Sequence, residues 1–309
     1  HELIPGLLKT TDRERPYWPS SPSIGWGRKE SLKSGDCHYW GVWWGMEPFD
    51  VYESKVGRFM SEYGFQGFPP LASIYEFTGT SQLTDSTPVL RAHQKHPTGM
   101  ETIRTYLERD YRPAKDFPSL VYLTQMVQAE GILKAISAHR MHKPYCMGTL
   151  YWQLNDSWPG ISWSSRDYYG RWKMLHYMMP SAYATLLISV RQTPGELSIY
   201  VTSDSLKDYA ARMELRVMDV KGNVRWSEIV PAIVKANTTS FICSRNIARN
   251  MAAADTMNTF LNVRILQDEK VMCETNHFFC APKNLRLQRP AMSVRFITDN
   301  DGVPAVELK

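Results

Sequence analysis

The sequence predicts an α/β domain followed by an all-β domain. Before residue 180, short apolar or aromatic runs alternate with longer stretches of helical spacing, and after it apolar and polar residues alternate with a period of two. The first pattern is typical of a parallel α/β sheet or barrel, and the second of a β-sandwich. Nine of the ten tryptophans lie before residue 173, and this change of composition also places a domain boundary near 180.

The first part contains four short segments with strand character, at residues 16–21, 36–40, 58–62 and 146–154. Between the last two, apolar residues recur at helical spacing over 120–140. We therefore predict four strands and one amphipathic helix. In parallel α/β barrels the catalytic groups lie where strands end and loops begin, so the ends of these segments are the places to search for a site.

The second part contains several segments in which apolar and polar residues alternate, with a Lys-Gly-Asn turn signal at 221–223. We expect about six strands here, arranged as a β-sandwich. The segments that carry this expectation are 196–202, 212–218, 223–227, 260–267 and 271–280.

Both ends of the chain indicate a piece of a longer protein. The chain starts at His1 in the pattern of a last helical turn, and no signal peptide is visible. From Pro282 a linker leads to a strand expected at 292–297, and the chain ends soon afterwards. The expected domains are residues 1–180, 181–282 and 283–309, the last being a linker and the start of a truncated further β domain.

The composition excludes several classes of partner. With 43% hydrophobic residues, 22% charged residues and a net charge of +5 that forms no Lys/Arg block, we expect no nucleic-acid binding. No apolar run approaches the roughly 18 residues of a membrane span, so no membrane partner is expected.

The five cysteines show neither a CxxC pair nor zinc-ligand spacing, and we expect no metal and no cofactor. Cys37 and Cys146 lie in apolar runs and should be buried thiols. A bridge between Cys273 and Cys280 stays open. His93 and His96 form a His-x-x-His spacing that lacks a third ligand.

Two segments carry the chemistry, residues 61–69 and 148–159. In each, a short apolar run ends in a polar or acidic group among aromatics, which is typical of a barrel mouth that binds sugars. Glu62 is the one strong candidate carboxylate, whereas glycoside hydrolysis usually uses two. From the residues alone, a salt-bridged glutamate at a strand end is an equal alternative.

Residues 1 to about 290 resemble the C-terminal half of a β-mannosidase of glycoside hydrolase family 2. The resemblance implies strands five to eight of a (β/α)8 barrel, followed by an immunoglobulin-like β-sandwich. The segments that carry it are 15–22, 35–40, 61–66, 122–125, 148–159, 162–163 and 169–177.

The resemblance also implies a retaining mechanism with Glu62, of the Ser-Glu-Tyr-Gly motif, as the nucleophile. In that family the general acid/base is a Glu that follows an Asn at the end of strand four. That strand would precede His1, and no Asn-Glu pair occurs in this chain. The 309 residues alone are therefore expected to be inactive. A separate N-terminal chain, or a second copy, is the expected partner that completes the barrel.

The resemblance makes Trp152 the wall of the subsite for the terminal sugar, with a packed barrel tryptophan as the alternative. Asn155 and Asp156 lie just beyond it and either bind sugar hydroxyls or cap the loop. Asp156 is also considered as a substitute acid.

The remaining candidates surround the second predicted strand. His38, Tyr39 and Trp40 lie at its end, where a histidine or a tyrosine can donate a hydrogen bond to Glu62. Trp26 and Trp44 lie in the adjoining loops, and packing is the alternative role for each.

The function expected for the intact protein is that of an exo-acting β-mannosidase that binds carbohydrates with a terminal β-mannose. A family 2 exo-glycosidase for another sugar, such as glucosamine, and a non-catalytic carbohydrate-binding fragment are the alternatives. The sequence does not determine the compartment; periplasmic, extracellular or lysosomal settings are favoured over the cytoplasm.

Overall fold

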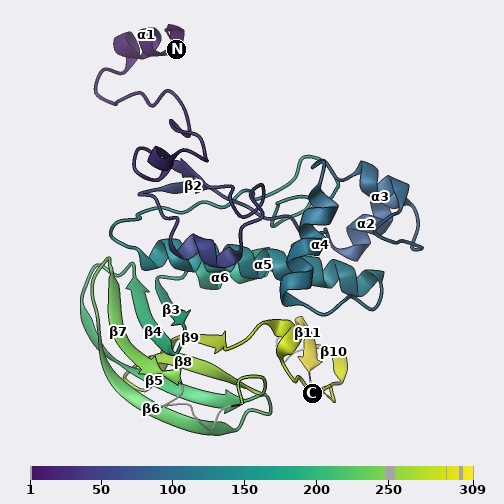
Figure 1. The fold of residues 1–309 in the computed structure, drawn as a ribbon, viewed down its shortest axis with the longest axis vertical. Coiled ribbons are helices and arrows are strands. Elements are labelled where there is room, and N and C mark those ends of the chain that lie inside the picture. The colour runs from purple at the N-terminus through teal and green to yellow at the C-terminus, as the bar shows by residue number, and fades with distance from the viewer. Residues whose placement is uncertain (1, 248–254, 290, 299–301, 309) are drawn as a thin grey trace.

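The computed structural model describes residues 2–247, 255–289, 291–298 and 302–308. A helix-rich part forms the upper half of Figure 1, a β-sandwich the lower half, and a small hairpin follows the sandwich. The helices α5 and α6 lie between the short parallel strands and the sandwich.

The short strands of the first part run parallel. β1 (Cys37–His38) pairs with β2 (Met60–Glu62), and the amide of Tyr39 continues the pairing by donating to the Glu62 carbonyl at 2.8 Å. On the other side of β2, Met60 forms a parallel bridge with Thr149. Three segments are therefore hydrogen-bonded side by side in the order in which they occur in the sequence.

Two of the four strand predictions need correction. Residues 16–21 form no strand and are all exposed, because Pro16 and Pro19 have no N–H to donate and no neighbouring strand lies beside them among the described residues. The segment 146–154 is extended and bonded to the β2 region, but only Thr149 forms a ladder bridge to it.

The helix predicted over 120–140 is confirmed as α5 (Phe117–Met141). The Asp116 carboxylate caps it by accepting from the amide of Ser119 at 2.8 Å, and Pro118 occupies the first turn, where no N–H is needed. The other helical elements are α1 (Leu3–Thr11), η1 (Lys29–Leu32), η2 (Phe49–Glu53), α2 (Leu71–Thr78), α3 (Pro88–Ala92), α4 (Gly99–Asp110) and α6 (Met174–Ala182).

The second part is a β-sandwich, as predicted, with seven strands among the residues that the structure describes. One sheet has the order β3-β4-β7 and the other β6-β5-β8-β9, and all pairs are antiparallel. Apolar side chains from both sheets form a separate core. The strands are β3 (Leu186–Thr193), β4 (Glu196–Ser203), β5 (Tyr209–Asp219), β6 (Val224–Val234), β7 (Thr239–Asn246), β8 (Thr259–Gln267) and β9 (Lys270–Phe278).

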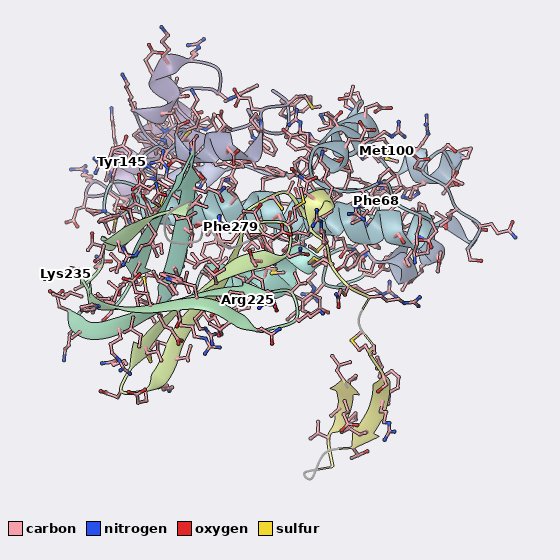
Figure 2. The ribbon with its side chains drawn as sticks, turned by 60° about the horizontal axis from the view of Figure 1, so that its bottom comes forward. Phe68, Met100, Tyr145, Arg225, Lys235 and Phe279 are labelled. Carbon is pink, nitrogen blue, oxygen red and sulfur yellow. The ribbon has the colours of Figure 1, made fainter. Side chains whose placement is uncertain are left out.

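After the sandwich, η3 (Pro282–Asn284) leads to a hairpin of β10 (Val294–Thr298) and β11 (Pro304–Leu308). The strand expected at 292–297 corresponds to β10. Figure 2 shows the hairpin standing apart from the rest of the molecule.

All five cysteines are free thiols, so Cys273 and Cys280 do not bridge. Cys37 and Cys146 are buried, as expected.

Candidate active site

Glu62 lies at the carboxyl end of β2 and is the centre of a hydrogen-bonded group. Its Oε1 accepts a hydrogen bond from Nε1 of Trp40 at 2.9 Å and lies 3.4 Å from Nδ1 of His38. Both partners come from the neighbouring parallel strand and the residues just after it. The structure thus brings together Glu62, His38 and Trp40, which the sequence analysis had proposed as a group.

A second carboxylate, Asp36, lies on the other side of His38. Its Oδ2 accepts from the hydroxyls of Ser21 at 2.6 Å and Ser61 at 2.5 Å, and lies 3.7 Å from Nε2 of His38. Burial acts to raise the pKa of Asp36, but these hydroxyl donors outweigh it and hold the pKa below its usual value. Asp36 is therefore an anion at neutral pH.

The position of Trp152 depends on Gly64. The amide of Trp152 donates to the carbonyl of Tyr63 at 2.7 Å, and a Cβ on Gly64 would lie only 2.3 Å from the Trp152 carbonyl oxygen. The same Cβ would lie 3.1 Å from the ring of Trp40. Only glycine lets these two strand ends approach so closely. The Trp152–Gln153 peptide is cis, and the Trp152 side chain is 43% exposed.

Trp44 belongs to an aromatic group beside this site. Its ring centroid lies 4.1 Å from that of the buried His96, which also contacts Trp43 and Trp163 edge-on. Burial lowers the pKa of His96, which favours the neutral ring. Trp163 in turn lies edge-on to Trp40 at 6.2 Å, so the group reaches the partner of Glu62.

His93 and His96 have separate surroundings. His93 stacks between Phe77 and Trp158, at 4.4 and 5.6 Å, and so turns away from the group around His96. In the part of the chain that the structure describes, no cluster of three or more His, Cys, Asp or Glu is placed to hold a metal ion.

The Asp156 carboxylate supports its own loop. Oδ2 accepts from Ser162 at 2.7 Å and from Ser164 at 2.6 Å, while Oδ1 accepts from Gln153 at 3.2 Å. The carbonyl of Asn155 accepts from the same glutamine at 3.0 Å. These bonds correspond to the loop-capping alternative of the sequence analysis.

Trp26 is the candidate that the structure does not join to the others. It is 40% exposed, and no described hydrogen bond or ring contact links it to Glu62, His38 or Trp40. Five further residues of this site were not predicted from the sequence, namely Asp36, Ser21, Ser61, Gly64 and Trp163. All five lie within the segments singled out for their resemblance, which was the available signal.

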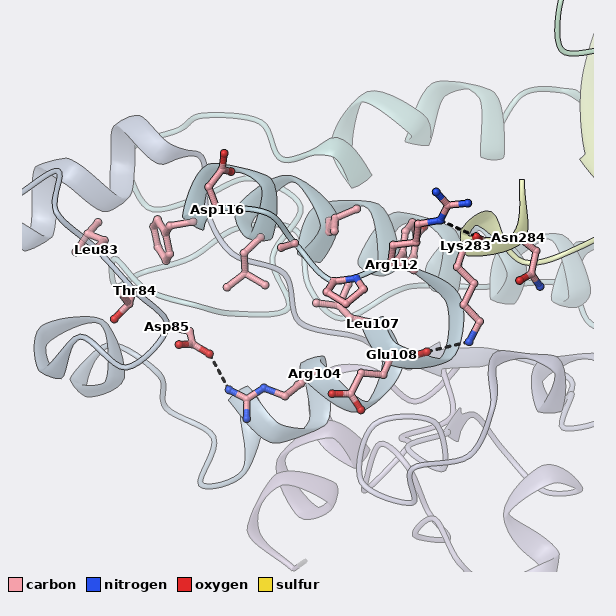
Figure 3. A pocket seen from close by; sticks show the side chains of 16 residues that line it. Leu83, Thr84, Asp85, Arg104, Leu107, Glu108, Arg112, Asp116, Lys283 and Asn284 are labelled. Atoms are coloured by element: carbon pink, nitrogen blue, oxygen red, sulfur yellow. Dashed lines mark hydrogen bonds and ion pairs between the residues drawn. The ribbon is translucent and has the colours of Figure 1, made fainter. Parts of the chain in front are cut away.

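A large cavity lies apart from these residues. A hollow of about 750 Å³ opens between α4, the start of α5 and the segment that follows the sandwich (Figure 3). Lys283 Nζ donates to the Glu108 carbonyl at 3.0 Å and thereby ties this segment to α4. None of the candidate site residues lines the cavity.

No helix among the described residues is both long and apolar enough to cross a membrane.

Glu62 thus lies at the end of a parallel strand with a fixed donor beside it, in a part of the chain that a β-sandwich follows. Residues 195–284 match the family model of the mannosidase Ig/CBM-like domain. Over most of its length the chain is similar to β-mannosidases, among them the following proteins.

The curated relatives include β-mannosidase B of Emericella nidulans and that of Aspergillus niger, each 32% identical, over 77% and 76% of this chain. The chain spans only about 30% of the length of either relative. Among solved structures, the β-D-mannosidase of Dictyoglomus thermophilum is 28% identical with a TM-score of 0.85, over 95% of this chain and 36% of that one.

An exo-chitosanase of Amycolatopsis orientalis has a TM-score of 0.61 at 13% identity, over 84% of this chain and 32% of that one. At this identity the likeness concerns the fold alone.

Proposed function

We propose that this chain supplies the nucleophile half of a retaining exo-β-mannosidase. The observation that carries the proposal is the setting of Glu62 at the end of a parallel strand, where its Oε1 accepts a hydrogen bond from Trp40 at 2.9 Å and lies 3.4 Å from Nδ1 of His38. We assign residues 1–180 to strands five to eight of a (β/α)8 barrel, 181–282 to an immunoglobulin-like domain, and 283–309 to a linker and the start of a further β domain. The parallel order of β1, β2 and Thr149 supports the barrel assignment.

In the proposed reaction the Glu62 carboxylate attacks the anomeric carbon of a terminal β-mannoside. The bond to the leaving oxygen breaks, that oxygen takes a proton from a second carboxylic acid, and a glycosyl ester on Glu62 results. Water, deprotonated by the same second group, then attacks the anomeric carbon and releases mannose and the Glu62 carboxylate. Trp152 and Trp44 are proposed walls of the sugar site, with Asn155 and Trp26 at its rim.

The second carboxyl group is assigned to a part of the barrel outside residues 1–309. Asp156 is the alternative within the chain, but the donors that hold its carboxylate favour a role in the loop. A separate N-terminal portion or a second copy is the proposed partner that completes the site. The 309-residue chain alone is expected to show no turnover of an aryl β-mannoside.

The test uses a chimera in which residues 1–309 replace the matching 36% of the Dictyoglomus thermophilum enzyme. The chimera should hydrolyse an aryl β-mannoside faster than an aryl β-glucosaminide, and Glu62→Gln should abolish this. The matched control is Glu101→Gln, which changes an exposed glutamate on α4 and should leave the rate intact. Full activity in the Glu62 variant would overturn the proposal.

A further inference from the structure

His38 lies between two carboxylates. Its Nδ1 is 3.4 Å from Oε1 of Glu62, and its Nε2 is 3.7 Å from Oδ2 of Asp36 and 3.3 Å from the hydroxyl of Ser21. The side chains of His38, Asp36 and Glu62 are 18%, 16% and 21% exposed, so water screens these charges only in part.

The hydroxyl protons determine what His38 does on the Asp36 side. A serine hydroxyl has one proton to donate, and Ser21 is placed to direct it to Asp36 at 2.6 Å. Towards Nε2 of His38 the same oxygen can then only accept, which requires a proton on Nε2.

The contact with Glu62 determines the protonation of the other ring nitrogen, Nδ1. A bare Nδ1 would direct its lone pair at the Glu62 carboxylate, whereas a protonated Nδ1 donates to it. Both ring nitrogens therefore face oxygen atoms that act as acceptors, so each nitrogen has to carry a proton.

We propose that Asp36 is a positioning residue that keeps protons on both nitrogens of His38, so that Glu62 has a charged donor beside it. This inference deepens the proposed function and rests on it for its catalytic meaning. The groups described around His38 are Asp36 just before β1, Glu62 on β2, and the neutral Ser21. The lowered pKa of Asp36 supports the arrangement, because its carboxylate is charged at neutral pH.

The charge on His38 has a consequence for the two steps of the reaction. A cationic donor stabilises Glu62 as a carboxylate, which is the group released when the glycosyl ester is hydrolysed. Asp36→Asn in the chimera should therefore lower kcat more than kcat/KM, about tenfold, because breakdown of the ester becomes slower. A general loss of structure would lower both together.

The deciding experiment is independent of activity. The 309-residue chain is labelled with ¹⁵N-histidine, and the His38 signals among its eight histidines are assigned with His38→Gln. At pH 7 the intact chain should show ¹⁵N shifts of two protonated ring nitrogens at His38. In Asp36→Asn one of them should move to the shift of a bare nitrogen, while Ser61→Ala, which keeps the carboxylate, should retain both.

Unchanged signals from His139, buried in α5, and from His277, on β9 of the sandwich, show that a variant is folded. A bare nitrogen at His38 in the intact chain, or two protonated nitrogens in folded Asp36→Asn, would overturn the inference. If Asp36→Asn does not fold, the intact chain still decides. None of these outcomes depends on the activity of Glu62→Gln. A failure of the proposed function can therefore be distinguished from a failure of this inference.

Discussion

The indole nitrogen of Trp40 lies 2.9 Å from Oε1 of Glu62 and donates a hydrogen bond to it. An indole N–H can only donate, so it fixes the position of an acceptor such as the Glu62 carboxylate. The contact joins the residues just after β1 to the end of β2, and a nucleophilic carboxylate needs such a fixed donor to remain charged in a partly buried site.

Removing this donor should slow the proposed reaction. Trp40→Phe keeps the aromatic contact with Trp163 but loses a hydrogen bond to a charged group, which contributes about 1.5–3 kcal/mol. We expect kcat of the chimera on an aryl β-mannoside to fall about 10- to 100-fold. Trp226→Phe, in the sandwich, is the matched control, and equal rates in the two variants would contradict the role of Trp40.

Gly64 should be intolerant of any side chain. In Gly64→Ala the new Cβ would meet the Trp152 carbonyl at 2.3 Å, so one of the two strand ends has to move. Overpacking of this kind costs about 1–3 kcal/mol, measured by urea unfolding. Gly25→Ala meets no atom within 4 Å and serves as the control. A Gly64 variant as stable as the Gly25 variant would show that the contact is easily relieved.

Arg140 should hold the two main parts of the molecule together. Its guanidinium donates to the carbonyls of Ala182 at 2.6 Å and Ala184 at 2.8 Å, and to Asp204 at 3.0 Å, and the side chain is 9% exposed. Arg140→Met leaves the two carbonyls without this donor, while Asp204 keeps the donor Lys143 at 2.6 Å, and the change should cost about 2–4 kcal/mol in unfolding free energy.

The control for Arg140 is Arg212→Met, which removes an exposed ion pair with Glu269 and should change stability by less than about 0.5 kcal/mol. If the sandwich of Arg140→Met melts independently, calorimetry should show a second transition. That result would show that the contacts of Arg140 couple the unfolding of the two parts. A loss of unfolding free energy in Arg140→Met as small as that in Arg212→Met would contradict this role of Arg140.

The site was predictable where neighbouring strands carry short motifs. Glu62, His38 and Trp40 each end a run with strand character, and parallel pairing brings such ends together. The support from Ser21 was not predictable, because it comes from a segment that forms no strand and meets Asp36 only through a loop. Pro16 and Pro19 are evidence against a strand. The aromatic residues between them nevertheless gave the segment strand character, which led to the incorrect prediction.

Strands of the sandwich could be predicted from the sequence where one face of the strand is exposed to solvent and the other is buried. β5 alternates between buried and partly exposed residues from Met213 on, and β8 does so apart from the buried Asn262, and the sequence shows that period. β3 begins with an apolar run that follows α6 directly, and β7 has a single buried position. Neither alternates cleanly, so both were missed although their sheet partners were found.

His139 should make the chain sensitive to acid. It is fully buried, its Nδ1 bonds to the Thr149 hydroxyl at 2.9 Å, and burial lowers its pKa from 6.5 to about 3. Between these values the unfolded chain binds a proton at this histidine that the folded chain does not. Stability must therefore fall as the pH falls from 6.5 towards 3.

The contribution of this histidine between pH 6.5 and 5 is about 2 kcal/mol, since each pKa unit corresponds to about 1.36 kcal/mol. His139→Gln keeps a polar partner for Thr149 but does not titrate, so its unfolding free energy should fall less steeply over that range. His142→Gln, at the partly exposed end of α5, is the control and should keep the original slope. Urea unfolding at pH 7.5, 6 and 5 measures how the unfolding free energy of the unchanged chain and of each variant depends on pH. An unchanged slope in His139→Gln would show that other groups cause the acid sensitivity. The next group to test would then be His277, because burial lowers its pKa to about 4.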